Sequence, residues 1–206
     1  MRRIEEFWIE FNPPAVQEEA EASGAVSLFY DMLDSLKGAI IVVFIVFACL
    51  FRVIGVDGDS MFPTLKDGDW LAISGITAEI KRGDIVVVTQ PWERNVPIIK
   101  RVIALGGDTV DIDFEKNKVY INGREIYEPY ILEPTRVSYD VEFPITVDEG
   151  KVFVMGDNRN VSKDSRSTEI GQIDRREILG KAIFVFFPGN KGGKVERDFG
   201  RIGVLS

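Results

Sequence analysis

A serine at the tip of a turn is the first residue whose neighbours suggest chemistry. Ser60 lies in VDGDSMFPTL (residues 56–65), where glycine, aspartate and proline surround it as they do in tight turns. A serine hydroxyl becomes a nucleophile only with a base within hydrogen-bond reach. The chain contains no histidine, which excludes Ser-His-Asp, Cys-His and histidine-based metalloprotease sites. If Ser60 is a nucleophile, its base must be a carboxylate or a neutral lysine amine.

Lys100 is the lysine whose sequence neighbours best suit the neutral form. It lies in PIIKRVIAL (residues 97–105), where both faces of a strand with a period of two would be apolar. Burial disfavours the ammonium, and lowering a lysine pKa from ~10.4 to ~7.5 requires roughly 4 kcal/mol of desolvation. Arg101 stays charged and must find a partner. A lysine at a sheet edge with its amine in solvent is the competing interpretation.

Composition narrows the remaining classes of protein. The chain has 206 residues, 45% of them hydrophobic, and a net charge of -8. These values suit one folded domain with appendages and disfavour nucleic acid as a partner, because nucleic-acid binding usually needs a basic face. Cys49 is the only cysteine, so disulfides within the chain are impossible. Without histidine most zinc sites are excluded as well, and we expect neither a metal nor a cofactor.

The first quarter of the chain has two unlike parts. Residues 1–35 carry two basic and eight acidic side chains, whereas GAIIVVFIVFACLF (38–51) carries no charge. Counted as residues 36–56, this stretch reaches the ~20 residues of a membrane-spanning helix, and we predict a transmembrane anchor there. A buried core helix is the alternative. Because basic residues flank both ends, charge alone leaves the orientation of the anchor open.

The rest of the chain has the pattern of a β-rich domain. Short runs of Val, Ile and aromatic residues alternate with Gly-Asp, Asn-Gly and Pro turn signals. We predict hairpins closed at Lys116-Asn117 and at Asn122-Gly123. The fold class is therefore mainly β, an N-terminal transmembrane helix followed by a β-rich domain. The predicted strands are residues 70–74, 85–90, 97–105, 109–114, 118–121, 151–155 and 181–187.

Four motifs, in order along the chain, resemble those of bacterial type I signal peptidases, which use a serine/lysine dyad. They are VDGDSMFPTL, RGDIVVV (82–88), KRVIALGGD (100–108) and GDNRNVSKDSR (156–166). Together with EPY at 128–130, the resemblance covers residues 54–188. A single anchor before the serine is similar to the compact Gram-positive members.

The resemblance implies roles for particular residues. Ser60 would attack the scissile carbonyl, and Lys100 would act as general base and later protonate the leaving amine. The oxyanion would rely mainly on the backbone N–H of Ser60, because Gly58 stands where other members have a serine. Supporting residues in the loop would be Ser162, which would orient the amine, and three residues that form ion pairs: Asp157, Asp164 and Arg166.

The resemblance also implies the organisation and setting of the chain. An acidic segment (1–35) and an anchor (36–56) would precede a peptidase domain (57–206) with a cap inserted at about 115–150. The enzyme would be a single-pass protein of the cell membrane with its catalytic domain outside the cytoplasm. It would remove signal peptides after Ala-x-Ala-like sites. Its partners would be preproteins, membrane lipid and the protein-export machinery.

Three other interpretations stay open on the sequence. A membrane-tethered β-domain could bind peptides without cleaving them, and Ser60→Ala would then change nothing. A self-cleaving serine/lysine repressor has a similar dyad but a DNA-binding domain in place of an anchor. Asp157, Asn158 and Asp164 could instead bind a divalent cation, although basic residues lie among them.

Overall fold

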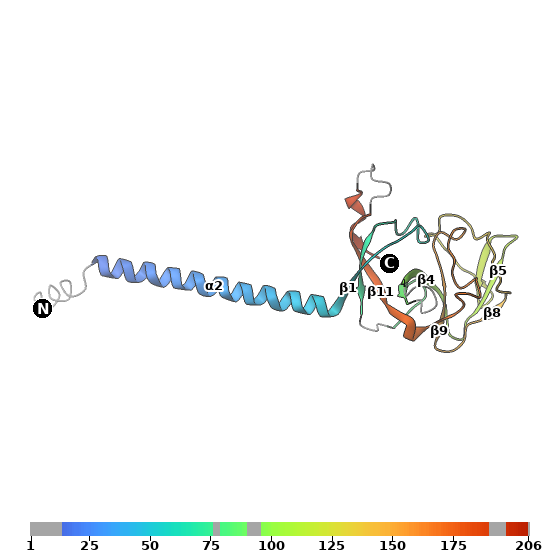
Figure 1. Ribbon diagram of the computed structural model, residues 1–206, viewed down its shortest axis with the longest axis horizontal. Helices are drawn as coiled ribbons and strands as arrows, with labels where there is room; N and C mark the ends of the chain where they lie inside the picture. The colour runs from blue at the N-terminus through green and yellow to red at the C-terminus, as the bar shows by residue number, and fades with distance from the viewer. Residues whose placement is uncertain (1–13, 76–78, 90–95, 190–196, 206) are drawn as a thin grey trace, which may run out of the picture. The chain divides into compact units, whose positions relative to one another are not determined.

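The chain divides into two compact units, one ending at Cys49 and one beginning at Leu50. The structure, a computed structural model, describes residues 14–75, 79–89, 96–189 and 197–205. The described part of the first unit is a helix, and the second unit is built of β-strands (Figure 1). Residues 1–13 of the predicted acidic segment lie outside the described residues.

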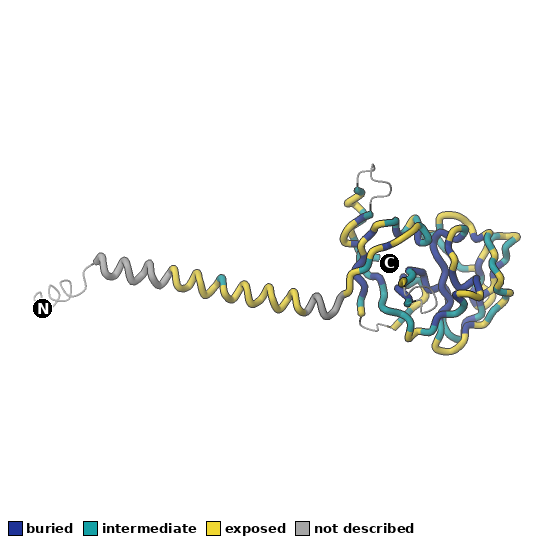
Figure 2. The backbone as a smooth tube through the Cα atoms, viewed as in Figure 1, coloured by how far each residue is buried: buried dark blue, intermediate teal, exposed yellow. Residues whose placement is uncertain are grey.

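Helix α2 runs from Pro14 to Leu50. Proline suits the first position of a helix, because its missing N–H would have no partner there. Between residues 26 and 45 almost every side chain is exposed (Figure 2). Within the ranges that the structure describes, no helix is long and apolar enough to span a bilayer. The helix also ends before the predicted anchor does, since residues 51–55 form strand β1.

The larger sheet is antiparallel throughout and carries the predicted chemistry. Its order is β1-β2-β11-β3-β4-β9-β10, and β12 pairs with β11. The strands β2, β4 and β9 agree with the predicted runs to within one residue. The bounds are β1 Phe51–Gly55, β2 Trp70–Ser74, β3 Ile85–Val88, β4 Ile98–Leu105, β9 Lys151–Met155, β10 Ile173–Asp174, β11 Ile178–Phe187 and β12 Gly203–Val204.

A smaller sheet of order β7-β6-β5-β8 lies at the other end of the β unit from β1 (Figure 1). Both predicted hairpins are present in it. Asn117 has φ 59° in the β5–β6 turn, and Asn122 and Gly123 have φ 53° and 75° in the two-residue β6–β7 turn. The bounds are β5 Thr109–Asp113, β6 Lys118–Ile121, β7 Arg124–Glu125 and β8 Ile145–Thr146. Two short 3-10 helices, η1 Arg175–Glu177 and η2 Phe199–Arg201, complete the elements.

Buried apolar side chains hold the two sheets and the serine-bearing segment in place. One cluster lies between the sheets and joins Phe153 of β9 to Val110 and Val119 of the small sheet. Another packs Met61 and Leu65, which flank the serine turn, against the large sheet. The expected mainly β fold is thus confirmed, and its core fixes the backbone on both sides of Ser60.

Candidate active site

The segment that carries Ser60 is a loop between β1 and β2 whose two ends are joined by backbone hydrogen bonds. Val56 N–H donates to Asp69 O at 2.8 Å, and Gly68 N–H donates to Val56 O at 2.9 Å. Inside the loop, the side chains of Met61 and Leu65 are almost fully buried. The loop is therefore an ordered part of the fold and presents Ser60 at a defined position.

Lys100, in the middle of β4, lies next to this serine. Its Nζ is hydrogen-bonded to Ser60 Oγ at 2.9 Å and donates to the backbone carbonyl of Ile99 at 3.1 Å. The strand pairs with β3 and β9 on its two sides, so it is an interior strand. The amine is thus held between one hydroxyl and one carbonyl, and the lysine is not an edge residue.

Burial changes the acidity of this amine. Only 4% of Lys100 is exposed. Desolvation lowers the pKa of Lys100 from 10.5 to about 8, and Arg166 adds to the lowering. The carboxylates of Asp164 and Asp157 act in the opposite direction, because they favour the ammonium. A substantial fraction of neutral amine is therefore present near pH 8, as a general base requires.

The loop after β9 contacts the backbone of the serine turn directly. Asn158 N–H donates to Ser60 O at 3.0 Å, and the Asn158 side chain donates to Asp59 O at 3.1 Å. Gly156 fits against the same place, since a Cβ there would collide with Ser60 O and with the Ser162 side chain. Asn158 belongs to the GDNRN motif but was not among the predicted supporting residues.

Asp157 and Arg101 form a buried, bidentate ion pair. Arg101 Nε and one terminal nitrogen each donate to Asp157 at 2.8 Å, and the pair is almost wholly excluded from water. Asp157 also accepts a hydrogen bond from the hydroxyl of Thr64, in the serine-bearing loop. Arg101 is thus the cation that needed a partner, and Thr64 is a contact that sequence inspection missed.

Asp164 and Arg166 pair with each other and hold their own loop in shape. Arg166 Nε donates to Asp164 Oδ1 at 2.8 Å, and Asp164 Oδ2 accepts the N–H of Gly156 at 3.0 Å. The guanidinium also donates to the carbonyl oxygens of Arg159 and Val137. Both carboxylates of the rival cation site are therefore engaged with guanidinium groups of the protein.

Ser162 lies in the same loop and is completely buried. Its hydroxyl oxygen has no hydrogen-bond partner among the residues that the structure describes. Ser162 therefore makes no hydrogen bond to the Lys100 amine in this structure. Its expected part in orienting Lys100 stays a prediction.

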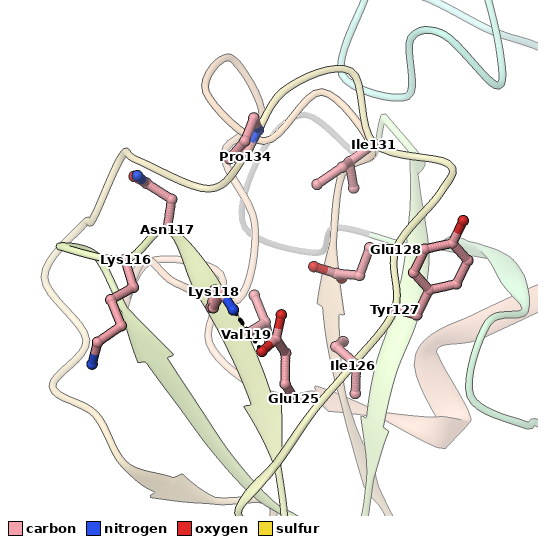
Figure 3. A pocket seen from close by; sticks show the side chains of 10 residues that line it. All are labelled: Lys116, Asn117, Lys118, Val119, Glu125, Ile126, Tyr127, Glu128, Ile131 and Pro134. Atoms are coloured by element: carbon pink, nitrogen blue, oxygen red, sulfur yellow. Dashed lines mark hydrogen bonds and ion pairs between the residues drawn. The ribbon is translucent and has the colours of Figure 1, made fainter.

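A third ion pair connects the site to a second cavity. Arg159 is fully buried and donates to Glu128 at 2.9 Å, and Glu128 accepts a hydrogen bond from Tyr130. The ring of Tyr130 in turn lies 4.0 Å from the guanidinium of Arg101. Glu128 also lines a cavity of about 480 Å³ at the ends of β6 and β7, where Lys118 and Glu125 form an ion pair (Figure 3).

A smaller cavity of about 200 Å³ contains the dyad itself. One side is formed by residues 54–57, at the end of β1, and the other by residues 96–100, at the start of β4. Gly58 has φ +87° and donates its N–H to Asp67 Oδ1 at 2.8 Å, which fixes the turn before the serine. A narrow apolar cavity beside a hydroxyl and a buried amine could hold a short extended peptide with small side chains.

Known proteins similar to this chain belong to one family. The model of the family described as "Signal peptidase, peptidase S26" matches residues 30–187. Signal peptidase I of Bacillus licheniformis is 39% identical over 189 residues, which cover 87% of this chain and 99% of that protein. Signal peptidase I T of Bacillus subtilis is 38% identical over 183 residues, 84% of this chain and 93% of that protein. The chain belongs to the signal peptidase family S26, which confirms the resemblance found in the sequence.

Among solved structures, a signal peptidase I from Enterococcus faecalis is similar to the chain. The two are 28% identical with a TM-score of 0.42, and the match covers 50% of this chain and 97% of the other. Family membership makes the chain a serine peptidase of the signal peptidase class.

Proposed function

We propose that the chain removes signal peptides from exported preproteins, with Ser60 as nucleophile and Lys100 as general base. The observation that carries this proposal is the 2.9 Å hydrogen bond between Lys100 Nζ and Ser60 Oγ. This bond joins the two residues that the sequence motifs predicted as nucleophile and base. Membership of the signal peptidase family supports the choice of substrate.

The proton transfer follows from the position of the amine. In its neutral form Lys100 has one lone pair, and because one N–H of the amine donates to the carbonyl of Ile99, the lone pair points away from that carbonyl. Ser60 Oγ lies within reach of it, so the amine takes the hydroxyl proton as oxygen attacks the peptide carbonyl. The resulting ammonium then protonates the leaving amine. Activity should consequently fall as the pH drops below about 8, because the base gains a proton.

The developing oxyanion would be bound by the backbone N–H of Ser60. Asn158 supports this indirectly, because its side-chain amide donates to Asp59 O at 3.1 Å and so fixes the plane of the peptide that carries the Ser60 N–H. One donor to an oxyanion is typically worth several kcal/mol in the transition state. Asp157, Asp164 and Arg166 would contribute by holding the loop against the serine turn, whereas the expected part of Ser162 in orienting the amine has no hydrogen bond to support it among the described residues.

The substrate would be an extended peptide that ends in small residues. The cavity between residues 54–57 and 96–100 has apolar walls and a volume of about 200 Å³, which suits alanine-sized side chains. An extended chain there would lie beside β1, one of the two end strands of the large sheet. Among the described residues β1 pairs only with β2, so its other edge could pair with the peptide.

We extend the proposal to a single-pass anchor built on the apolar end of α2, residues 36–50. Support comes from residues 40–45, where every side chain is large, apolar and more than half exposed. Such a surface is rare in water and favourable in lipid. The β unit would act outside the cytoplasm at the cell membrane, where lipid, preproteins and the export machinery are its partners.

A preprotein digestion tests the proposed function. The purified chain should cut a preprotein after a small residue, whereas Ser60→Ala and Lys100→Met should each reduce kcat by at least about a thousandfold, as loss of a nucleophile or base does. The exposed residues Ser138 and Lys81 provide matched controls, and Ser138→Ala and Lys81→Met should leave the rate unchanged. Circular dichroism checks that all four variants are folded. Full turnover by Lys100→Met would contradict the mechanism, and a binding domain without activity would show no cleavage at all.

A further inference from the structure

The cavity beside Ser60 contains one acidic side chain in its lining, that of Asp57. Apart from Ser60 and Lys100, the other lining residues are apolar: Ile54, Gly55, Val56, Met61, Val96, Pro97, Ile98 and Ile99. An exposed carboxylate in an apolar cleft is the main source of charge that a bound peptide would meet there.

The Asp57 carboxylate differs from the other carboxylates around the site. Asp157 is paired with Arg101, Asp164 with Arg166, and Asp69 with Arg201. Asp57, by contrast, is exposed and forms no hydrogen bond or ion pair with any residue that the structure describes. Its charge is thus not compensated within the described part of the chain and remains available to a ligand.

In the catalytically active form, Lys100 does not compensate the negative charge of Asp57. Lys100 must be neutral when it accepts the serine proton, so the cleft then carries the single negative charge of Asp57. A cationic group nearby is attracted and an anionic group repelled, with an energy that depends on exposure and salt.

Asp57 is also close enough to the reacting serine to affect residues next to the cleaved bond. It lies three positions before Ser60 in the sequence, and an extended chain advances at most about 3.6 Å per residue, so their Cα atoms lie within about 11 Å. A long cationic side chain on a residue flanking the scissile bond can cover such a span. Alternate side chains of an extended peptide point to opposite faces. If pockets bind the small side chains on one face, the positions between them can carry a long cationic side chain.

We propose that Asp57 is a specificity-determining residue that favours preproteins with Lys or Arg within two residues of the cleaved bond. The inference rests on the proposed function and deepens it. It concerns the choice among substrates and leaves the dyad chemistry unchanged.

A substrate series tests the inference. Each preprotein carries Lys, Gln or Glu at one varied position. Three positions are tested in turn: the second residue before the cleaved bond, and the first and second residues after it. For at least one position, kcat/KM of the Lys substrate should exceed that of the Glu substrate about two- to fivefold at low salt. Asp57→Asn should bring this ratio to about one, and Asp57→Lys should invert it. Added salt should weaken the preference of the unmodified chain.

A matched control separates this effect from a general change of surface charge. Asp111 is an exposed aspartate on β5 of the small sheet, and Asp111→Asn should keep the Lys-to-Glu ratio of the unmodified chain. A ratio near one at every position, or a ratio that Asp57→Asn leaves unchanged, overturns the inference. Failure of the unmodified chain to cut the Gln substrate would overturn the proposed function instead, so the two failures are distinguishable.

Discussion

At the scale of single residues, the site depends on Lys100, whose burial makes the charged ammonium form unfavourable. Desolvation is the largest influence on the Lys100 amine and lowers its pKa to about 8. The nearby pairs Asp157–Arg101 and Asp164–Arg166 are each neutral as a whole, so they stabilise the ammonium only in part. The same burial that makes the amine a base must therefore destabilise the folded state.

Replacing Lys100 by methionine should raise the stability of the fold. The folded-state pKa of about 8 lies below the ordinary value of 10.5, so the ammonium is disfavoured in the folded chain. The penalty is complete below pH 8 and disappears as the pH rises through 10.5. At 1.36 kcal/mol per pH unit, Lys100→Met should increase the free energy of unfolding at pH 7 by up to about 3 kcal/mol.

Urea unfolding of both proteins at pH 7 and pH 10 measures this difference. The gap in stability should be large at pH 7 and small at pH 10. If the Lys100→Met variant is less stable than the unmodified chain at pH 7, then burial of the Lys100 ammonium does not destabilise the fold.

Sequence inspection could predict the two dyad residues but few of the contacts around them. Ser60 and Lys100 were predicted from motifs that resemble those of signal peptidases, because a turn signal and an apolar run alone left an exposed edge lysine as the alternative. The bonds from Asn158 to the serine turn and from Thr64 to Asp157 join positions more than ninety residues apart. No local pattern reports such contacts, because the sheet topology alone brings the segments together.

At the scale of elements, the site is the meeting point of the β1–β2 loop, strand β4 and the loop after β9. Strand β4 pairs with β9, so the end of β9 delivers the GDNRN loop next to the lysine. The fit between this loop and the serine turn is close at Gly156. We therefore expect that a single methyl group added at position 156 lowers the rate of cleavage.

Gly156→Ala should lower kcat by more than about tenfold, because the added Cβ would collide with the Ser60 carbonyl and must displace one of the two loops. Gly203→Ala is the matched control, since a Cβ at that position meets nothing within 4 Å. Steady-state cleavage rates and thermal unfolding of both variants measure the effect. If Gly156→Ala keeps the full rate, the two loops do not need this close contact.

Strand prediction succeeded where alternating or apolar runs were bounded by turn signals. It failed at β1, which we had placed in the anchor. FRVIG follows the apolar helix without a turn signal, and a short apolar run does not distinguish a strand from a helix. Its pairing with Trp70–Ser74 of β2 decides the matter, and that partner lies beyond the serine loop in the sequence.

At the scale of the whole molecule, the chain is a helix followed by an independent β unit. The unit that begins at Leu50 contains both sheets, the dyad and every ion pair discussed above. Arg201 of η2 pairs with the buried Asp69 and donates to Thr64 O, so even the C-terminal segment supports the serine-bearing loop. This unit has its own core and should fold without the helix.

A chain limited to residues 50–206 should stay folded and cleave a short soluble peptide at a rate within about threefold of the full chain, because the chemistry needs nothing from α2. It should also lose membrane association, which the proposed anchor supplies. Flotation with lipid vesicles and peptide cleavage, run on both chains, measure the two properties. A truncated chain that floats with vesicles as well as the full chain would contradict the role given to α2.

The central claim is that a neutral lysine activates the serine, and its most direct test is the titration of that lysine. NMR of the folded protein with ¹³Cε-labelled lysine follows each amine with pH, and the signal missing from Lys100→Met identifies Lys100. The account predicts a midpoint at about 8, well below the 10.5 of an exposed lysine. A midpoint near 10.5 would contradict it, because the amine would then be charged and unable to accept the proton of Ser60.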